Sequence, residues 1–255
     1  MGKKLYLAIL LGLSAICGFA ENTDEKGSAK DANNPLATIK SFSVHNIYSP
    51  SICGMDGNLN TAWLRYAQPI GRVLIRASLP INTVSIPEIN NSGLGDLNLF
   101  ATYIVTKPSS PNQFGLGPMV SMPTATSSVL GSGKWMAGVA LVGYFAGNDI
   151  FQCGFLATWQ HSFAGSEKRA PVHVSSIQPF LMWQLKKGFY LRSTGNAILD
   201  FQNNNYLVPI GLGVGKIITI NKVICNLFFE PQFAVYNYGK GLPRIQLFLG
   251  INTQF

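Results

Sequence analysis

Polar and apolar residues alternate along most of this chain, and this alternation limits the possible folds more than any other feature. A period of two is typical of β-strands, because successive side chains point to opposite faces. No run of 18 consecutive apolar residues follows residue 20, so the sequence excludes a bundle of membrane-spanning helices. We predict twelve strands, over residues 36–47, 59–68, 71–81, 95–105, 113–122, 134–146, 150–163, 172–185, 188–198, 206–217, 223–235 and 243–255.

The composition agrees with strands that are apolar on one face only. Charged residues make up 12% of the sequence and apolar residues 47%, and the chain contains 26 glycines and 14 prolines. A soluble enzyme of this size would carry more charge on its surface, and a disordered chain would be less apolar. Both classes are therefore disfavoured.

The N-terminus has the features of a secretory signal peptide. Lys3 and Lys4 precede an apolar run that ends at Ala15, and small residues lead to a cleavage site after Ala20. The polar stretch that follows lacks aromatic residues, which predicts a flexible leader. The expected organisation is a signal peptide at 1–20, a flexible polar leader at 21–34 and one domain at 35–255.

Strand length and connection length indicate a membrane barrel. About 9–11 residues suffice for a tilted strand to cross a bilayer, and each predicted strand is that long. The connections alternate between long and short up to residue 187, with 82–94 as one of the long loops, as in outer-membrane barrels. A closed barrel also pairs every strand edge, which bilayer hydrocarbon requires. We therefore predict an all-β fold, a transmembrane antiparallel up-and-down β-barrel of about twelve strands in the bacterial outer membrane.

The faces of the predicted strands fit this barrel. In the last strand Leu247 and Leu249 share one face, and Gln246 and Gln254 share the other. A soluble barrel or sandwich would bury the apolar face, and alternation alone leaves that alternative open. Strand length, the signal peptide and the terminal Phe255, which resembles the signal read by the barrel-insertion machinery, favour the membrane barrel. Aromatic residues that fit its interfacial bands are Trp135, Phe145, Trp159, Trp183, Phe189 and Tyr190.

Seven short stretches carry a family resemblance. In chain order they are LGDL (94–97), GLGP (115–118), PTAT (123–126), LGSGKW (130–135), SFAG (162–165), QPFL (178–181) and VPIG (208–211). Together they resemble a family of bacterial outer-membrane barrels associated with transport or with a phenol meta-cleavage pathway, loosely grouped with fatty-acid and aromatic-hydrocarbon channels. The resemblance covers most of residues 35–255 and implies an outer-membrane channel.

Charged residues on the predicted polar face are the candidates for lining the lumen. They are Lys40, Arg65, Arg72, Arg76, Asp96, Arg192, Glu230 and Arg244. We expect Arg72 and Arg76 to face the lumen, and either to pair with Asp96 and Glu230 or to leave a positive field. Basic residues outnumber acidic ones in this set, and rings of Arg or Lys favour anions. The first hypothesis is therefore a passive channel or transporter for small anionic or aromatic solutes.

Two alternatives belong to other classes of function. One is a structural or surface-interaction barrel whose lumen is closed by its own side chains. The other is an outer-membrane phospholipase, which needs a Ser and a His side by side. His173 and Ser175 are two residues apart and share a face, but their position at a strand end favours an interfacial role. We expect no enzymatic activity.

The expected partners are outer-membrane lipid, the barrel-insertion machinery acting through Phe255, and small solutes. Basic residues are scattered singly, which predicts no nucleic-acid partner. The sequence predicts no cofactor and no metal site, because His45, His161 and His173 lie far apart and lack carboxylates at ligand spacing.

Three glycines at 211, 213 and 215 share one face of the tenth predicted strand. Nucleotide binding would need a helix after them, and the sequence indicates none. We predict instead that they make room in the lumen for bulkier neighbours.

Overall fold

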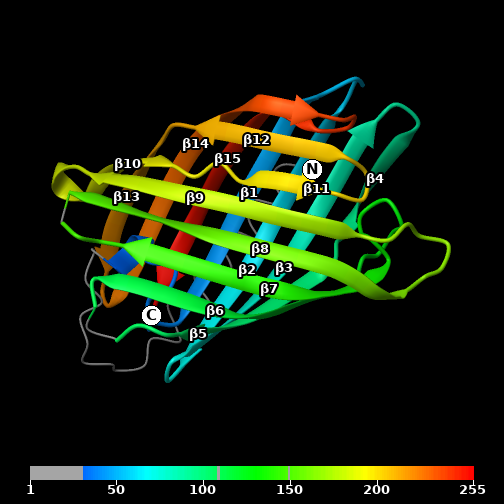
Figure 1. Ribbon diagram of the computed structural model, residues 1–255. Coiled ribbons are helices and arrows are strands. Elements are labelled where there is room, and N and C mark those ends of the chain that lie inside the picture. Colours follow the sequence, from blue (N-terminus) through cyan, green and yellow to red (C-terminus); the bar gives the residue numbers. More distant parts are fainter. Residues whose placement is uncertain (1–30, 108–109, 149) are drawn as a thin grey trace.

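The computed structural model describes residues 31–107, 110–148 and 150–255, which form a β-barrel (Figure 1). The predicted signal peptide and residues 21–30 of the predicted leader lie outside the described residues. Two short 3-10 helices are present, η1 (Asp31–Asn33) and η2 (Lys186–Gly188). The strands are β1 (Ser41–Ile52), β2 (Asn58–Ile70), β3 (Val73–Ile86), β4 (Ile89–Leu94), β5 (Leu97–Ile104), β6 (Asn112–Met122), β7 (Lys134–Phe145), β8 (Phe151–Gly165), β9 (His173–Gln184), β10 (Phe189–Ser193), β11 (Ala197–Asp200), β12 (Asn205–Gly211), β13 (Gly213–Ile220), β14 (Val223–Tyr238) and β15 (Pro243–Gln254).

These strands occupy twelve positions around the barrel wall. β4 and β5 both pair with β3 and follow one another along a single position. β10 and β11 share the position beside β9, and β12 and β13 share the position beside β14. Each position pairs antiparallel with the next, and β15 pairs with β1 to close the ring. The predicted closed antiparallel barrel of twelve strands is confirmed.

Each end of the barrel carries its own set of connections. The connections 71–72, 105–111, 146–150, 185–188 and 221–222 lie at one end, which we call the short-turn end. The connections 53–57, 87–88, 123–133, 166–172, 201–204 and 239–242 lie at the other, which we call the loop end, and 123–133 is the longest of them. At the short-turn end the chain also closes on itself, because the N–H of Phe255 donates to the carbonyl of Lys40 (3.1 Å).

One predicted loop is a hairpin. Residues 82–94 belong to β3 and β4, which pair around a turn at 87–88. The segment is polar, which is why the sequence suggests a loop, but its polar side chains find partners on neighbouring elements. Thr83 and Ser92 join through their hydroxyls at 2.9 Å, and Asn91 donates to the hydroxyl of Ser127 at 3.0 Å.

The outer face of the wall is apolar. Exposed patches of this extent mark contact with a membrane or another apolar surface, whereas a soluble barrel would bury its apolar face. Exposed side chains on this face include Leu116, Val139, Leu181, Ile210, Val214, Phe233 and Val235.

Aromatic rings form a band near each end of this outer face, as in membrane barrels. Near the short-turn end, Phe151 packs on Trp183 and Phe114 packs on Phe145. Near the loop end, rings contact one another at centroid distances of 5.0 to 6.4 Å. These loop-end residues are Trp159, His161, His173, Phe201, Tyr206 and Tyr238. The prediction is wrong for Tyr190, which is fully buried inside the barrel.

The three glycines of β12 and β13 make room inside the barrel, as predicted. Gly213 stands opposite Arg192 on β10, and a Cβ there would lie 2.6 Å from Cβ of Glu230 on β14. A Cβ on Gly215 would overlap the ring of Tyr190. Side chains of β10 and β14 can therefore meet across the strand that separates them.

Replacing Gly215 with alanine is expected to destabilise the barrel, because the added Cβ meets the buried ring of Tyr190. Overpacking of this kind costs about 1–3 kcal/mol. Gly147→Ala is the matched control, since nothing lies within 4 Å of a Cβ at that turn position. The measurement is the temperature at which the fast-migrating folded band on a gel converts to the unfolded band. Equal midpoints for the two variants would contradict the close packing around Gly215.

Candidate functional site in the barrel lumen

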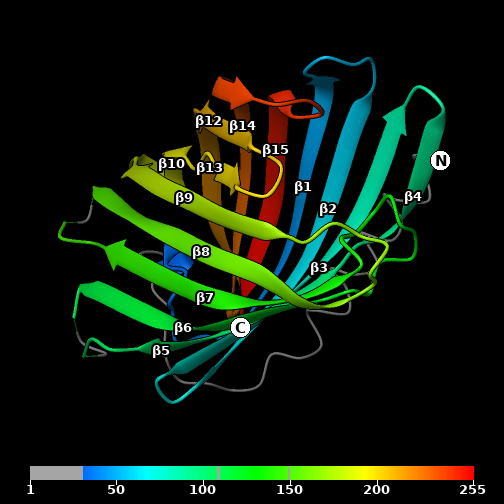
Figure 2. The same ribbon diagram turned by 45° about the vertical axis from the view of Figure 1, so that its right-hand side comes forward.

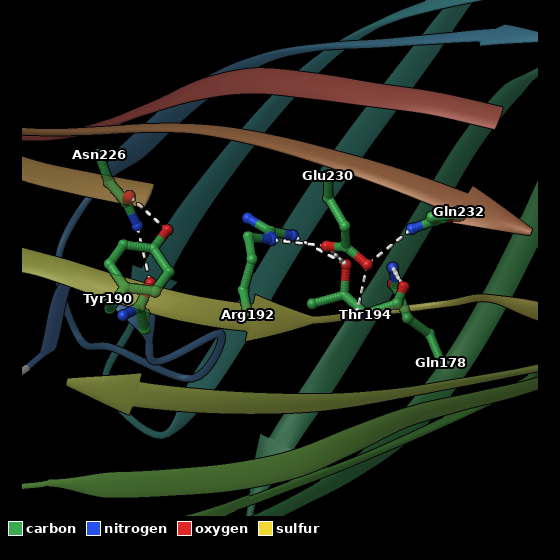
Figure 3. Close-up of polar contacts among 8 residues, drawn as sticks. Gln178, Tyr190, Arg192, Thr194, Asn226, Glu230 and Gln232 are labelled. Carbon is green, nitrogen blue, oxygen red and sulfur yellow. Dashed lines mark hydrogen bonds and ion pairs between the residues drawn. The ribbon is translucent and has the colours of Figure 1, made fainter. Parts of the chain in front are cut away.

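A buried ion pair lies inside the barrel. Nε of Arg192 on β10 lies 2.7 Å from Oε2 of Glu230 on β14, and the two side chains are 6% and 0% exposed. The carboxylate also accepts the backbone N–H and the hydroxyl of Thr194, both at 2.7 Å, and Nε2 of Gln232 at 3.0 Å (Figure 3). A buried carboxylate requires partners of this kind. The charge of Glu230 is thus committed to this network.

Aromatic rings hold the arginine of this pair from the other side. Cζ of Arg192 lies 3.6 Å from the ring centroid of Phe228 and 5.3 Å from that of Phe248. A guanidinium over an aromatic face is attracted by the ring quadrupole, and Nη2 also donates to the hydroxyl of Thr194 at 2.8 Å. The position of Arg192 is therefore fixed from several directions.

Residues 32–39, which we call the lumen segment, run through the inside of the barrel before β1 begins. Nδ2 of Asn226 on β14 donates to the Ala32 carbonyl (3.3 Å) and to Oδ1 of Asn33 (2.7 Å). Nδ2 of Asn34 donates to Oε1 of Gln113 on β6 (3.0 Å). β14 and β6 are six positions apart in the ring of twelve, so the segment reaches from one wall to the opposite wall. Figure 2 shows η1, in blue, behind β7 and β8.

This placement corrects the predicted leader and the predicted first strand. The leader is expected to be flexible through residue 34, but Asn34 is buried and bonded to the wall. The strand is expected from residue 36, but Leu36 is fully buried in a cluster with apolar residues of β3, β5 and β7. In the sequence, the apolar residues at 36 and 39 suggest the start of a strand. In the structure, they pack inside the lumen. The strand therefore starts at Ser41, and its odd-numbered residues face the lumen.

A cavity of about 180 Å³ lies between the lumen segment and the wall. Its charged lining residues are Arg65 on β2, Arg76 on β3 and Arg192 on β10, and no Asp, Glu or Lys is among the described residues that line it. The apolar part of the lining includes Leu74, Phe180, Met182, Phe228 and Phe248. The cavity thus combines a cationic side with an aromatic and aliphatic side.

His45 on β1 joins the polar groups of this cavity. Its Nδ1 accepts a hydrogen bond from Nη1 of Arg65 at 2.8 Å, because a guanidinium can only donate. Its Nε2 then carries the proton and donates to Oδ1 of Asn252 on β15 at 2.7 Å. The ring is therefore a neutral bridge between the arginine and the amide.

The structure gathers half of the predicted lumen residues at this site and places the rest elsewhere. Arg65, Arg76 and Arg192 line the cavity, and Glu230 bonds to Arg192. Of the two alternatives expected for Arg72 and Arg76, pairing with Asp96 and Glu230 does not occur, because both carboxylates have other partners.

Arg72 lies outside the cavity. It belongs to the turn at 71–72, is exposed, and donates through Nη2 to the carbonyls of Val105 (3.2 Å) and Thr106 (2.6 Å). Because the turn interrupts the strand alternation, a spacing of four residues does not bring Arg72 to the face of Arg76.

Asp96 holds a loop. Its Oδ2 accepts the N–H and the hydroxyl of Ser132, both at 2.7 Å, and its Oδ1 accepts the N–H of Ala125 at 3.2 Å. These contacts fix the connection 123–133 at the loop end. Lys40 is exposed and precedes β1, and Arg244 is exposed near the start of β15. Neither residue lines the cavity.

Four residues of the site have roles that sequence reasoning missed: His45, Tyr190, Thr194 and Asn226. Tyr190 donates its hydroxyl to Oδ1 of Asn226 at 2.6 Å, inside the barrel. The three alternate glycines of β12 and β13 could have pointed to these contacts in the sequence. They mark a strand across which the flanking strands can touch, and those strands carry Tyr190, Asn226 and the ion pair.

The contacts of His173 and Ser175 do not form a nucleophile and base pair. Nε2 of His173 accepts from Nε1 of Trp159 at 3.0 Å, and the hydroxyl of Ser175 donates to the carbonyl of Thr158 at 2.8 Å. Within the described residues, no group of three His, Cys, Asp or Glu side chains is arranged to hold a metal ion. In the same part of the chain, no helix has the length and apolar character to cross a membrane.

Comparisons with known proteins concern the fold. The chain matches no protein-family model and no curated protein. Among solved structures, it is similar to an outer-membrane channel from Pseudomonas putida F1, with a TM-score of 0.66 and 13% identity over 92% of this chain and 100% of that chain. The NanC porin gives a TM-score of 0.54 and 12% identity over 84% and 98% of the two chains. The KdgM porin in complex with disordered oligogalacturonate gives 0.50 and 10% over 84% and 99%. The chain thus shares its barrel fold with outer-membrane channels and porins.

Glu230→Gln is expected to destabilise the barrel, because Arg192 would remain as a buried charge without its counter-ion. Breaking one side of a buried pair costs about 3–5 kcal/mol. The double variant with Arg192→Met removes both charges and is expected to recover most of that loss. The thermal midpoint of the folded gel band measures both. A double variant less stable than Glu230→Gln would contradict this account of the pair.

Proposed function

We propose that this protein is an outer-membrane channel through which small anionic solutes diffuse. The observation that carries the proposal is the contrast between the two faces of a closed wall. The outside is apolar and banded with aromatic rings, which suits lipid on that side. Around the cavity inside, the charged residues are three arginines.

The positive charge of this interior supports selectivity for anions. Glu230 neutralises Arg192, whereas Arg65 and Arg76 have no carboxylate partner among the described residues. A narrow passage with low-dielectric walls focuses the field of such charges, and rings of Arg favour anions. The shared fold with outer-membrane channels is consistent with passive diffusion.

One observation favours the second candidate, a barrel that is closed and structural. The lumen segment spans from β14 to β6, and the side chains of Gln152, Tyr190, Asn226 and Glu230 are nearly or completely inaccessible to solvent. In the channel proposal, the lumen segment is what closes the passage. A conductance measurement can separate such a channel from a permanently closed barrel.

Arg76→Ala is expected to lower the anion preference, because it removes a lumen cation that no carboxylate neutralises. Arg72→Ala is the matched control, since Arg72 lies in an exposed turn. The measurement is the reversal potential of the inserted protein in a KCl gradient. It should move toward the cation side for Arg76→Ala and stay at the wild-type value for Arg72→Ala. Equal shifts in the two variants would contradict selectivity at the cavity.

Deleting residues 31–37 is expected to raise the single-channel conductance several-fold, because most of the segment that crosses the lumen is removed. A Gly-Ser replacement of the same seven residues keeps the chain length but loses the contacts of Asn34 and Leu36. It should give an intermediate conductance with frequent closures. If the deletion variant inserts and stays silent, the closed structural barrel is favoured over the channel.

A further inference from the structure

Arg65 and Arg76 line the cavity, and their guanidinium groups carry N–H donors that no described residue uses. Nε of each is buried and has no hydrogen-bond partner among the described residues. Arg65 uses Nη1 on His45, and Arg76 stacks on Phe100 with its Cζ 4.2 Å from the ring centroid. A guanidinium has five N–H donors and no acceptor. These two side chains can therefore hold a group that offers only acceptors.

The two arginines are neighbours in the wall. Arg65 on β2 stands opposite Ser78 on β3, and Arg76 stands opposite Ala67 on β2. They are thus diagonal neighbours on the same inward face, a relation that spaces residues by about 7–8 Å. At this spacing both guanidinium groups can converge on one planar carboxylate, whose two oxygens suit the arginine fork.

The charge around these donors is not compensated. Glu230, which neutralises Arg192, is held by that arginine, Thr194 and Gln232. No carboxylate is among the described residues that line the cavity. A bound anion would supply the missing negative charge and the missing acceptors together.

The rest of the lining restricts the anion further. Leu74, Phe180, Met182, Phe228 and Phe248 give the cavity an apolar side, which an inorganic ion would leave in contact with water. Its volume of about 180 Å³ is close to the roughly 150 Å³ of an engineered apolar cavity that holds benzene. The space therefore suits a body of six or seven carbon atoms attached to one anionic group.

We propose that this cavity is a binding site for a small monocarboxylate with a compact apolar body. The carboxylate lies against Arg65 and Arg76, and the apolar body lies against Phe180, Phe228 and Phe248. The proposal rests on the proposed function for the route by which the solute enters. It adds to that function a defined site and a class of solute.

Titration calorimetry of the folded mature protein in detergent tests the site with three probes. Cyclohexanecarboxylate has both features, cyclohexylmethanol has the body without the charge, and acetate has the charge without the body. We expect saturable binding of the first, with a Kd at least tenfold lower than that of either other probe. Equal affinity for the alcohol, or no saturable binding of cyclohexanecarboxylate, would overturn the proposal.

Two variants locate the site. Arg76→Met should weaken binding of cyclohexanecarboxylate at least tenfold, whereas Arg72→Met, in the exposed turn, should leave it unchanged. Ala67→Asp places a carboxylate directly opposite Arg76 and should abolish binding by occupying the site, while pairing the charge and preserving the fold. Wild-type affinity in Arg76→Met or in Ala67→Asp would overturn the assignment.

Conductance separates this proposal from the proposed function. Saturable, variant-sensitive binding by a protein that never conducts would keep the site and overturn the channel. Anion-selective conductance without binding of cyclohexanecarboxylate would keep the channel and overturn the site.

Discussion

Closure of the sheet between β1 and β15 is the constraint on which the rest of this structure depends. In hydrocarbon every backbone N–H and C=O needs a partner, and an open edge would leave a whole row unpaired. Closure also fixes the register, and a slip of one residue would exchange the two faces of a strand. In this register Ser43 lies opposite Asn252 on β15 and opposite Arg65 on β2. His45 is two residues further along the same face, so it lies inside the barrel, within reach of the side chains of Asn252 and Arg65. The polar cavity is thus a consequence of how the ring closes.

The three arginines inside the barrel are stabilised in different ways. Arg192 has a carboxylate, and glycines on the intervening strand let the two side chains meet. Among the residues that the structure describes, Arg76 has the face of Phe100, and Arg65 has the ring of Trp63 (4.8 Å to the centroid) and the nitrogen of His45. Aromatic contact offsets part of the cost of burying a cation but supplies no acceptor. The barrel therefore has one satisfied charge that fixes its shape and two whose donors remain available.

The sequence predicts the wall of this barrel better than its contents. Alternation finds all twelve wall positions, because a wall between lipid and lumen imposes a period of two along its whole length. It fails at Leu36, where an apolar residue is buried by the lumen segment, and at Arg72, where a turn interrupts the alternation. Side-chain parity finds Arg65, Arg76, Arg192 and Glu230 but not which of them meet. Pairing depends on which strands are adjacent and on the glycines between them, so Glu230 reaches Arg192 rather than Arg76.

The contents of the lumen differ in how firmly they are held. Removing Arg192 from Glu230 would strand two buried charges, so that pair opens only at a cost comparable to much of a domain's stability. The lumen segment is held by amide contacts at Asn33 and Asn34 and by the buried side chain of Leu36. Water can replace amide contacts at little net cost, since a neutral hydrogen bond contributes only about 0.5–1.5 kcal/mol. Movement of the segment would leave the ion pair intact and expose Arg65 and Arg76, whose cavity it borders. The ion pair is thus held more firmly than the lumen segment.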